Sequence, residues 1–161
     1  MQSSIVESIF LKESNRQRFY QGENVPSIEV ENIYQLGKLV ALRFLEWVIA
    51  HPLGVVALPT GKTPEYFIKT LEFYKNNWST REVRDEIQKY GIPTSAMVKF
   101  PDTTGLTFVM LDEFFPMPSS HKNSFCHYVS VFYTSVLGKC KFLVHDVTHS
   151  LLSLKLITYN F

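Results

Sequence analysis

The sequence lacks most of the features that mark secreted, membrane and nucleic-acid-binding proteins. It has only two cysteines in 161 residues, too few for a disulfide framework, which favours a reducing compartment. No apolar run is long enough to cross a bilayer, and the N-terminus shows no signal-peptide pattern. Lys and Arg number 16 against 15 Asp and Glu, so no basic surface is expected. These absences predict a cytoplasmic protein that binds neither nucleic acid nor membrane.

What the sequence does contain is apolar material for a core. Hydrophobic residues make up 45% of the chain and aromatic residues 14%, which suffices for one globular domain. Residues 1–31 are weakly patterned and interrupted by Gly22 and Pro26, so we expect an N-terminal arm. Residues 32–138 carry strand and helix signals and form the predicted domain, and 139–161 form a divergent tail.

Two short apolar segments, 54–58 and 106–111, predict strands covered on both faces of a parallel sheet. Helices are predicted between them, over 64–74 and from a capping box at 79–82 to Gly91. A right-handed crossover therefore joins parallel neighbours in an α/β fold. Because open sheets of this class usually hold more strands, we expect the chain to be truncated at its C-terminus, with an unpaired edge that promotes self-association.

Apolar residues at helical spacing predict two further helices. One covers 32–50, with this inward stripe: Ile33, Leu36, Val40, Phe44 and Trp47. The other runs from about residue 125 to Gly138, with this inward stripe: Phe125, Val129, Phe132 and Val136. Both stripes are interpreted as core.

A Thr-Gly turn of residues 60–63 joins the first predicted strand to its helix. Its residues are Thr60, Gly61, Lys62 and Thr63, and Thr63 is the expected N-cap. Such a turn offers backbone N–H groups and the positive end of a helix dipole to a phosphate, with a lysine and two hydroxyls nearby. An ordinary crossover turn is an equal alternative. A nucleotide-binding P-loop is disfavoured, because the glycine required five residues before Gly61 is a valine.

Asp112 and Glu113 follow the second predicted strand. Ligand sites of open α/β sheets lie beyond the carboxyl ends of the strands, so this pair and the 60–63 turn should face one crevice. Adjacent carboxylates point in different directions, so one can line the pocket while the other pairs with a cation or caps a helix. Desolvation at a buried strand end would suit a general base. Surface acids are the alternative.

Three short blocks, in order, resemble the glucosamine-6-phosphate deaminase/isomerase family: LPTGKTP at 58–64, MLDEF at 110–114 and HKNSF at 121–125. The resemblance covers roughly residues 32–138 and implies a three-layer open parallel sheet of the sugar-phosphate isomerase (Rossmann-like) type, without a cofactor. It implies that Thr60, Gly61 and Thr63 bind the phosphate, with Lys62 replacing the usual second glycine. Asp112, supported by Glu113, would move a proton between C1 and C2 of the opened sugar, giving fructose 6-phosphate and ammonia from glucosamine 6-phosphate.

The family's later Asp-Gly-His run and downstream Glu, which open the sugar ring, have no match in this chain. Two hypotheses therefore stand: an amino-sugar phosphate isomerase/deaminase, or a truncated fragment that binds sugar phosphate without turnover. A hydrolase resembling the 6-phosphogluconolactonases is a further alternative, although that class typically has Arg where this chain has Phe114. His145 and His149 lack the remainder of a zinc motif, so no metal is expected. The sequence leaves association into a homo-oligomer open.

Overall fold

The computed structural model describes residues 4–14, 21–22, 27–94, 98–114, 116–138, 140–145 and 156–159. Its elements, in chain order, are α1 (Ile5–Ser14), α2 (Ile33–Ala50), β1 (Val55–Leu58), α3 (Glu65–Asn76), α4 (Arg81–Lys89), β2 (Thr107–Met110), α5 (Phe125–Tyr128), the π-helical turn η1 (Val129–Tyr133), α6 (Thr134–Leu137), β3 (Lys141–His145) and β4 (Leu156–Tyr159). No helix in these ranges is both long enough and apolar enough to cross a membrane.

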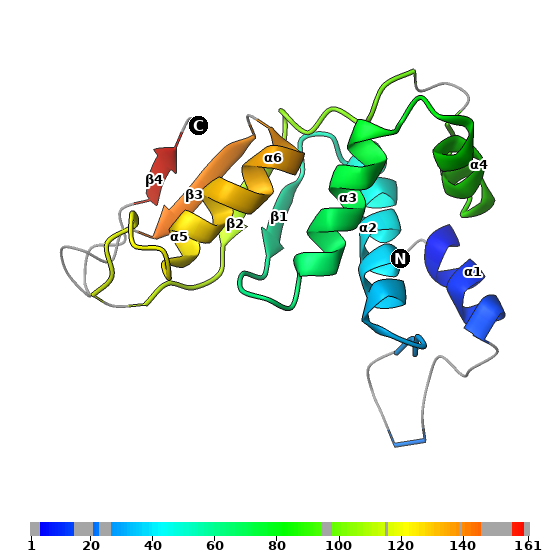
Figure 1. The fold of residues 1–161 in the computed structure, drawn as a ribbon, viewed down its shortest axis with the longest axis horizontal. Helices are drawn as coiled ribbons and strands as arrows, with labels where there is room; N and C mark the ends of the chain where they lie inside the picture. Colours follow the sequence, from blue (N-terminus) through cyan, green and yellow to red (C-terminus); the bar gives the residue numbers. More distant parts are fainter. Residues whose placement is uncertain are drawn as a thin grey trace.

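The strands form one sheet in the order β1-β2-β3-β4. The first three are parallel, and β4 runs antiparallel to β3 (Figure 1). Leu58 aligns with Met110, and Phe108 aligns with Phe142. The predicted α/β class and the parallel pairing of the first two strands are therefore confirmed. The third and fourth strands lie within residues 139–161, where the sequence pattern predicted no strand.

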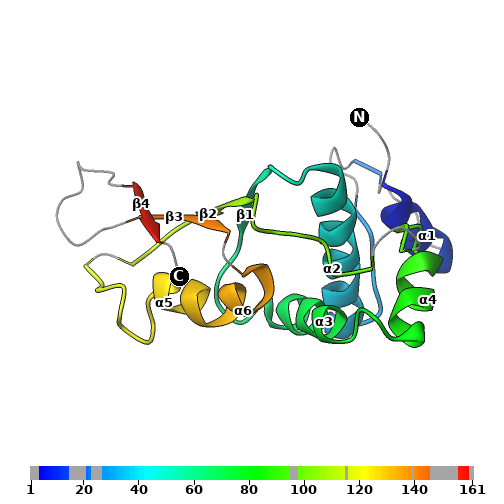
Figure 2. The ribbon, with the colours of Figure 1, turned by 90° about the horizontal axis from the view of Figure 1, so that it is seen from above.

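The described helices α3, α5 and α6 all lie on one side of the sheet (Figure 2). They cover the strand side chains that are fully buried, Phe108, Met110 and Phe142. Val55, in contrast, is 64% exposed. The prediction that the first strand is covered on both faces is therefore wrong for β1, because β1 is the edge strand and the helices near it pack on a single face.

Helix α2 ends at Ala50 as predicted and begins at Ile33, one residue after the predicted start. The Asn32 side chain caps it by accepting a hydrogen bond from the Gln35 backbone N–H at 3.0 Å. Its inward face differs from the predicted stripe, because Ile33, Leu36 and Val40 are 38–41% exposed. The buried set is instead Gly37, Leu39, Ala41, Leu42, Phe44, Leu45 and Val48. Two neighbours, α1 and α3, contact this helix and set the face that it buries.

Gly37 allows α2 to approach the first turn of α3 closely. A Cβ atom at this position would lie 2.6 Å from the Cβ of Tyr66 and 2.7 Å from its carbonyl carbon. Such a distance is far below van der Waals contact, so only glycine fits without movement of a helix. The glycine therefore fixes where α3 begins relative to α2.

The helix ends of α4 are partly as predicted. Thr80, and not Ser79, is the N-cap, and its hydroxyl accepts from the Val83 N–H at 3.4 Å. The predicted capping box over 79–82 is therefore wrong by one residue. Gly91 ends the helix with φ of 78°, as predicted, since glycine adopts this left-handed conformation without strain.

Candidate functional site

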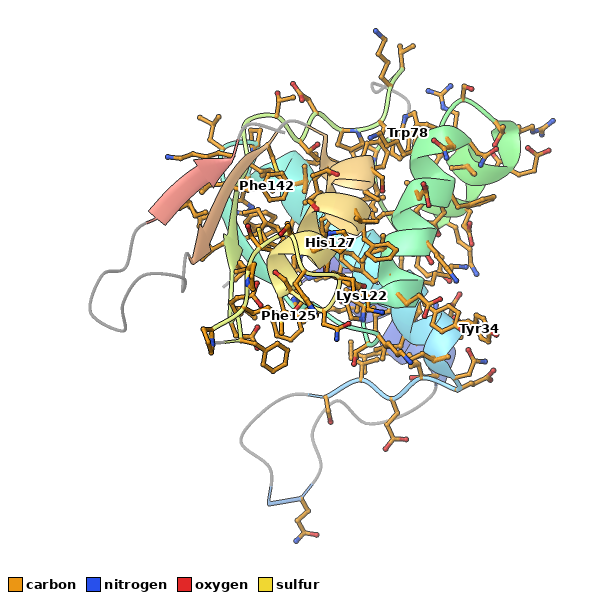
Figure 3. All side chains as sticks on the ribbon, turned by 60° about the vertical axis from the view of Figure 1, so that its left-hand side comes forward. Tyr34, Trp78, Lys122, Phe125, His127 and Phe142 are labelled. Carbon is orange, nitrogen blue, oxygen red and sulfur yellow. The ribbon has the colours of Figure 1, made fainter. Side chains whose placement is uncertain are left out.

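Both predicted site segments lie at the end of the sheet where the parallel strands β1 and β2 have their carboxyl ends, which is called the site edge below. The 60–63 turn follows β1, and Asp112 and Glu113 follow β2. Because Leu58 pairs with Met110 in a parallel ladder, the two strands end together. The N-terminal ends of α3 and α5 also lie at the site edge (Figure 1). Figure 3 shows Lys122 and Phe125 beside the start of α5, and Trp78 at the opposite end of the helical layer.

The 60–63 turn presents free backbone donors. Gly61 has φ of 88°, and no atom lies within 4 Å of the position that a Cβ would take, so the turn is open on this side. The Glu65 N–H donates to the Lys62 carbonyl at 3.2 Å and closes the turn. Within the described part of the chain, the amides of Gly61, Lys62 and Thr63 donate to no protein acceptor. These amides are available to an anion.

Helix α3 begins one residue later than predicted. Pro64 occupies the N-cap position, and no side chain caps this end. The prediction that Thr63 is the N-cap is therefore wrong, because the first available amide, that of Glu65, is already bonded within the turn. Thr63 is instead an exposed residue of the turn itself. The predicted inward residues of this helix, Phe67, Leu71 and Tyr74, are buried as expected.

The charged residues beside the turn are two lysines, Lys62 and Lys69, and two glutamates, Glu65 and Glu72. The Lys69 ammonium pairs with the Glu65 carboxylate at 2.5 Å. The hydrogen bond from Lys69 lowers the pKa of Glu65, and the charge of Lys62 lowers it further. Because Lys69 offsets Glu65, the exposed Lys62 remains as the cation nearest the amides of the turn. Lys62 can therefore attract an anion, although water and salt screen an exposed charge.

A cavity of about 490 Å³ opens beside the turn, between α3 and the η1 turn. Its lining includes Gly61, Lys62, Tyr128 and Phe132. A second cavity, of about 550 Å³, lies between α2 and β1, and its lining includes Phe44, Trp47 and Val55. That cavity lies away from the turn and has two charged side chains in its lining, whereas the cavity at the turn has four, so the cavity at the turn suits a polar ligand better.

The helix that follows the acidic pair contains a π-helical turn, which changes its inward face. Val129 and Val136 are buried as predicted, but Phe132 is 46% exposed, so its predicted core position is wrong. A π-helical turn holds one residue more than an α-helical turn, and this shift brings Tyr133 inward instead. Tyr133 is 1% exposed, and its hydroxyl donates to the Pro59 carbonyl at 2.6 Å.

The two adjacent carboxylates have different surroundings. Asp112 is exposed, and the described residues do not provide the desolvation expected for a general base. Glu113 is half-buried and accepts four hydrogen bonds. The donors are the Ser124 hydroxyl at 2.6 Å and the backbone N–H groups of Phe114, Phe125 and Cys126 at 2.9–3.0 Å. Glu113 therefore ties the loop after β2 to the start of α5.

Burial by itself would raise the pKa of Glu113. The hydrogen bonds from Ser124 and from the Cys126, Phe114 and Phe125 backbone outweigh it, so the pKa lies below its ordinary value. The carboxylate is thus ionised at neutral pH and is fully used as an acceptor. This geometry leaves Asp112 as the member of the pair that can reach a ligand.

The third sequence block forms the turn that leads into α5. The His121 ring nitrogen Nδ1 accepts from the Asn123 N–H at 3.2 Å. Ser124 caps the helix, which begins at Phe125 as predicted. His145 ends strand β3, and His149 lies outside the described residues. In the ranges that the structure describes, no three metal-ligating side chains gather.

The side chains of Cys126 and Cys140 are both buried. Burial raises the pKa of Cys140 to about 11, so this thiol is protonated at neutral pH. A thiol in that state is a poor nucleophile. Cys140 is therefore not a candidate nucleophile.

Sequence reasoning missed two residues that shape this site, Tyr133 and Gly37. Neither leaves a local signal, because the π-helical turn and the close helix approach arise only in the folded chain.

In the comparisons with known proteins, no family model, no curated protein and no solved structure matches this chain.

Proposed function

We propose that the protein binds a sugar phosphate at the 60–63 turn and acts as an amino-sugar phosphate isomerase/deaminase. The observation that supports this most is the set of free amides at Gly61, Lys62 and Thr63, located with Asp112 at the site edge. A dianionic phosphate satisfies several such amides at once and interacts favourably with the dipole of α3. The resemblance of the three sequence blocks to the deaminase family indicates glucosamine 6-phosphate as the ligand. It also favours the three-layer sheet of that family.

In the proposed reaction, the turn holds the phosphate while the sugar extends toward the end of β2. The Asp112 carboxylate takes a proton from C2 of the open-chain sugar and returns it to C1, while a proton of the amino group moves to O1, so that C2 becomes an imine. Water adds to C2 of this imine, and the nitrogen leaves as ammonia to give the ketose phosphate. Glu113 holds the loop that carries Asp112. Asp112 is exposed, so a bound sugar itself must exclude water from this carboxylate.

Binding without turnover is the second candidate function. The exposure of Asp112 favours it, because a solvated carboxylate is a weak base. A lactonase-like hydrolase is supported less, since the aromatic side chain of Phe114 stands where that class has a cation.

Calorimetric titration with glucosamine 6-phosphate and with glucosamine tests the phosphate site. The wild-type protein should prefer the phosphorylated sugar, and Gly61→Val should remove the preference, because a β-branched residue does not tolerate φ of 88°. Gly22→Val is the matched control, since Gly22 has the same φ and equally open surroundings outside the site. Equal affinity of the wild type for the two sugars contradicts the proposal.

A steady-state ammonia assay separates the two candidates. Ammonia release from glucosamine 6-phosphate that depends on Asp112 supports the deaminase. Tight binding without ammonia release supports the binding protein.

A further inference from the structure

Tyr133 is the residue through which the helix after the acidic pair reaches the 60–63 turn. Among the described residues, its hydrogen bond to the Pro59 carbonyl, at 2.6 Å, is the only one that joins this helix to residues 59–63. The two residues are 74 positions apart in the chain. Burial raises the pKa of Tyr133, so the hydroxyl keeps its proton and remains a donor.

The carbonyl that Tyr133 holds belongs to the peptide unit that leads into the turn. A trans peptide is planar, so the Pro59 C=O and the Thr60 N–H point in opposite directions. A bond that fixes the carbonyl on the Tyr133 side therefore directs the Thr60 N–H away from the helix. Within the described chain this N–H donates to no protein acceptor. It is the first amide of the turn and is available beside those of Gly61, Lys62 and Thr63.

The ring of Tyr133 is itself held on several sides. Its centroid lies 5.2 Å from that of Phe108 in β2 and 6.5 Å from that of Phe67 near the start of α3. The helix that carries Tyr133 begins where Glu113 binds the backbone of Phe125 and Cys126. Packed aromatic rings and a hydrogen-bonded helix start leave the hydroxyl little freedom to move.

We propose that Tyr133 is a positioning residue, which orients the Thr60 amide and so links the acidic end of β2 to the phosphate-binding turn. This inference rests on the proposed sugar-phosphate function. Loss of the hydroxyl frees the Pro59–Thr60 peptide to rotate and leaves the core otherwise filled. Binding of the phosphate should weaken, while binding of the sugar ring should not.

The test compares Tyr133→Phe with Tyr74→Phe. Tyr74 is also 1% exposed, and its hydroxyl interacts electrostatically with Glu86, away from the turn, so this control matches the loss of a buried tyrosine hydroxyl. Dissociation constants for glucosamine 6-phosphate and for glucosamine are measured by calorimetry on each folded variant. Tyr133→Phe should weaken binding of the phosphorylated sugar about tenfold, as for loss of one hydrogen bond to a charged group, and leave glucosamine unchanged. Tyr74→Phe should change neither.

Two further variants keep the test decisive if Tyr133→Phe melts below the assay temperature. 4-Fluorophenylalanine at position 133 fills the space of the hydroxyl without donating, and 4-aminophenylalanine restores a donor. The first should lose the phosphate preference, and the second should recover it. If every variant prefers the phosphorylated sugar to within twofold of wild type, the inference about Tyr133 is wrong, while the proposed function is unaffected. A wild type without phosphate preference refutes the proposed function, and the role of Tyr133 falls with it.

Discussion

Replacement of Glu113 by Gln tests how the acidic pair divides its roles. Oε1 of Glu113 accepts from the Phe114 and Phe125 amides, and Oε2 accepts from the Ser124 hydroxyl and the Cys126 amide. Gln keeps one oxygen, but it places an NH₂ group against the Cys126 N–H. A hydrogen bond to a charged group contributes about 1.5–3 kcal/mol, and partial exposure reduces that value. We expect the free energy of unfolding to fall by about 1–2 kcal/mol, and Tm by about 3–6 °C.

The pH dependence has a defined sign. Because the hydrogen bonds lower the folded-state pKa of Glu113 below its ordinary value of 4.5, the stabilisation is present above that value. It is lost as the pH falls through the lower, folded-state pKa. Gln does not titrate, so the difference in stability between wild type and Glu113→Gln should be greatest at pH 7 and should narrow below about pH 4.5.

Urea denaturation followed by circular dichroism at several pH values measures this difference. Glu82→Gln is the control, because Glu82 is an exposed carboxylate in the first turn of α4. If Glu113→Gln is as stable as Glu82→Gln at pH 7, the hydrogen bonds drawn to Glu113 do not hold the loop. A difference that widens with acid would also refute the reasoning.

Three other substitutions give separable outcomes. Asp112→Asn should lower any ammonia release about 100-fold or more and leave binding of glucosamine 6-phosphate nearly unchanged, and unaltered turnover would remove Asp112 from the mechanism. Gly37→Ala should lower the free energy of unfolding by about 1–3 kcal/mol despite the better helix propensity of alanine, because a methyl group would lie 2.6 Å from the Cβ of Tyr66. Thermal melting measures this effect, with the exposed substitution Gln88→Ala as the control. An unchanged Tm would contradict the close approach of the two helices. Lys62→Gln should weaken phosphate binding and reduce its dependence on salt, as titrations at two ionic strengths can show, and an identical salt dependence would place the bound charge elsewhere.

Much of the framework follows from local sequence signals. The apolar segments at 54–58 and 106–111 contain β1 and β2, the pattern over 32–50 gives α2, and Gly91 ends α4. Each of these depends on the residues of one segment, so the sequence alone carries the information.

The differences arise where two segments meet. Val55 is exposed because β1 ends the sheet, which its own apolar pattern does not reveal. Tyr133 replaces Phe132 in the core because a π-helical turn shifts the helix face by one residue. Gly37 matters only because Tyr66 packs on it.

The candidate site shows the same division. The order of the three sequence blocks and the positions of the strand ends predicted that the 60–63 turn and Asp112 lie at the same end of the sheet. The sequence does not show that Thr63 is not the N-cap of α3, because this depends on the hydrogen bond between the Glu65 amide and the Lys62 carbonyl. The exposure of Asp112 likewise depends on which residues cover the end of β2.

The backbone amides of the 60–63 turn carry the central claim, so their response to ligand tests it most directly. Two-dimensional ¹H–¹⁵N NMR spectra, recorded during titration with glucosamine 6-phosphate, report each amide separately. The account predicts the largest downfield shifts at Gly61, Lys62 and Thr63, and much smaller shifts with glucosamine, because only the phosphate bonds these N–H groups. The claim is contradicted if these amides do not respond, or if the largest changes lie around the apolar cavity between α2 and β1.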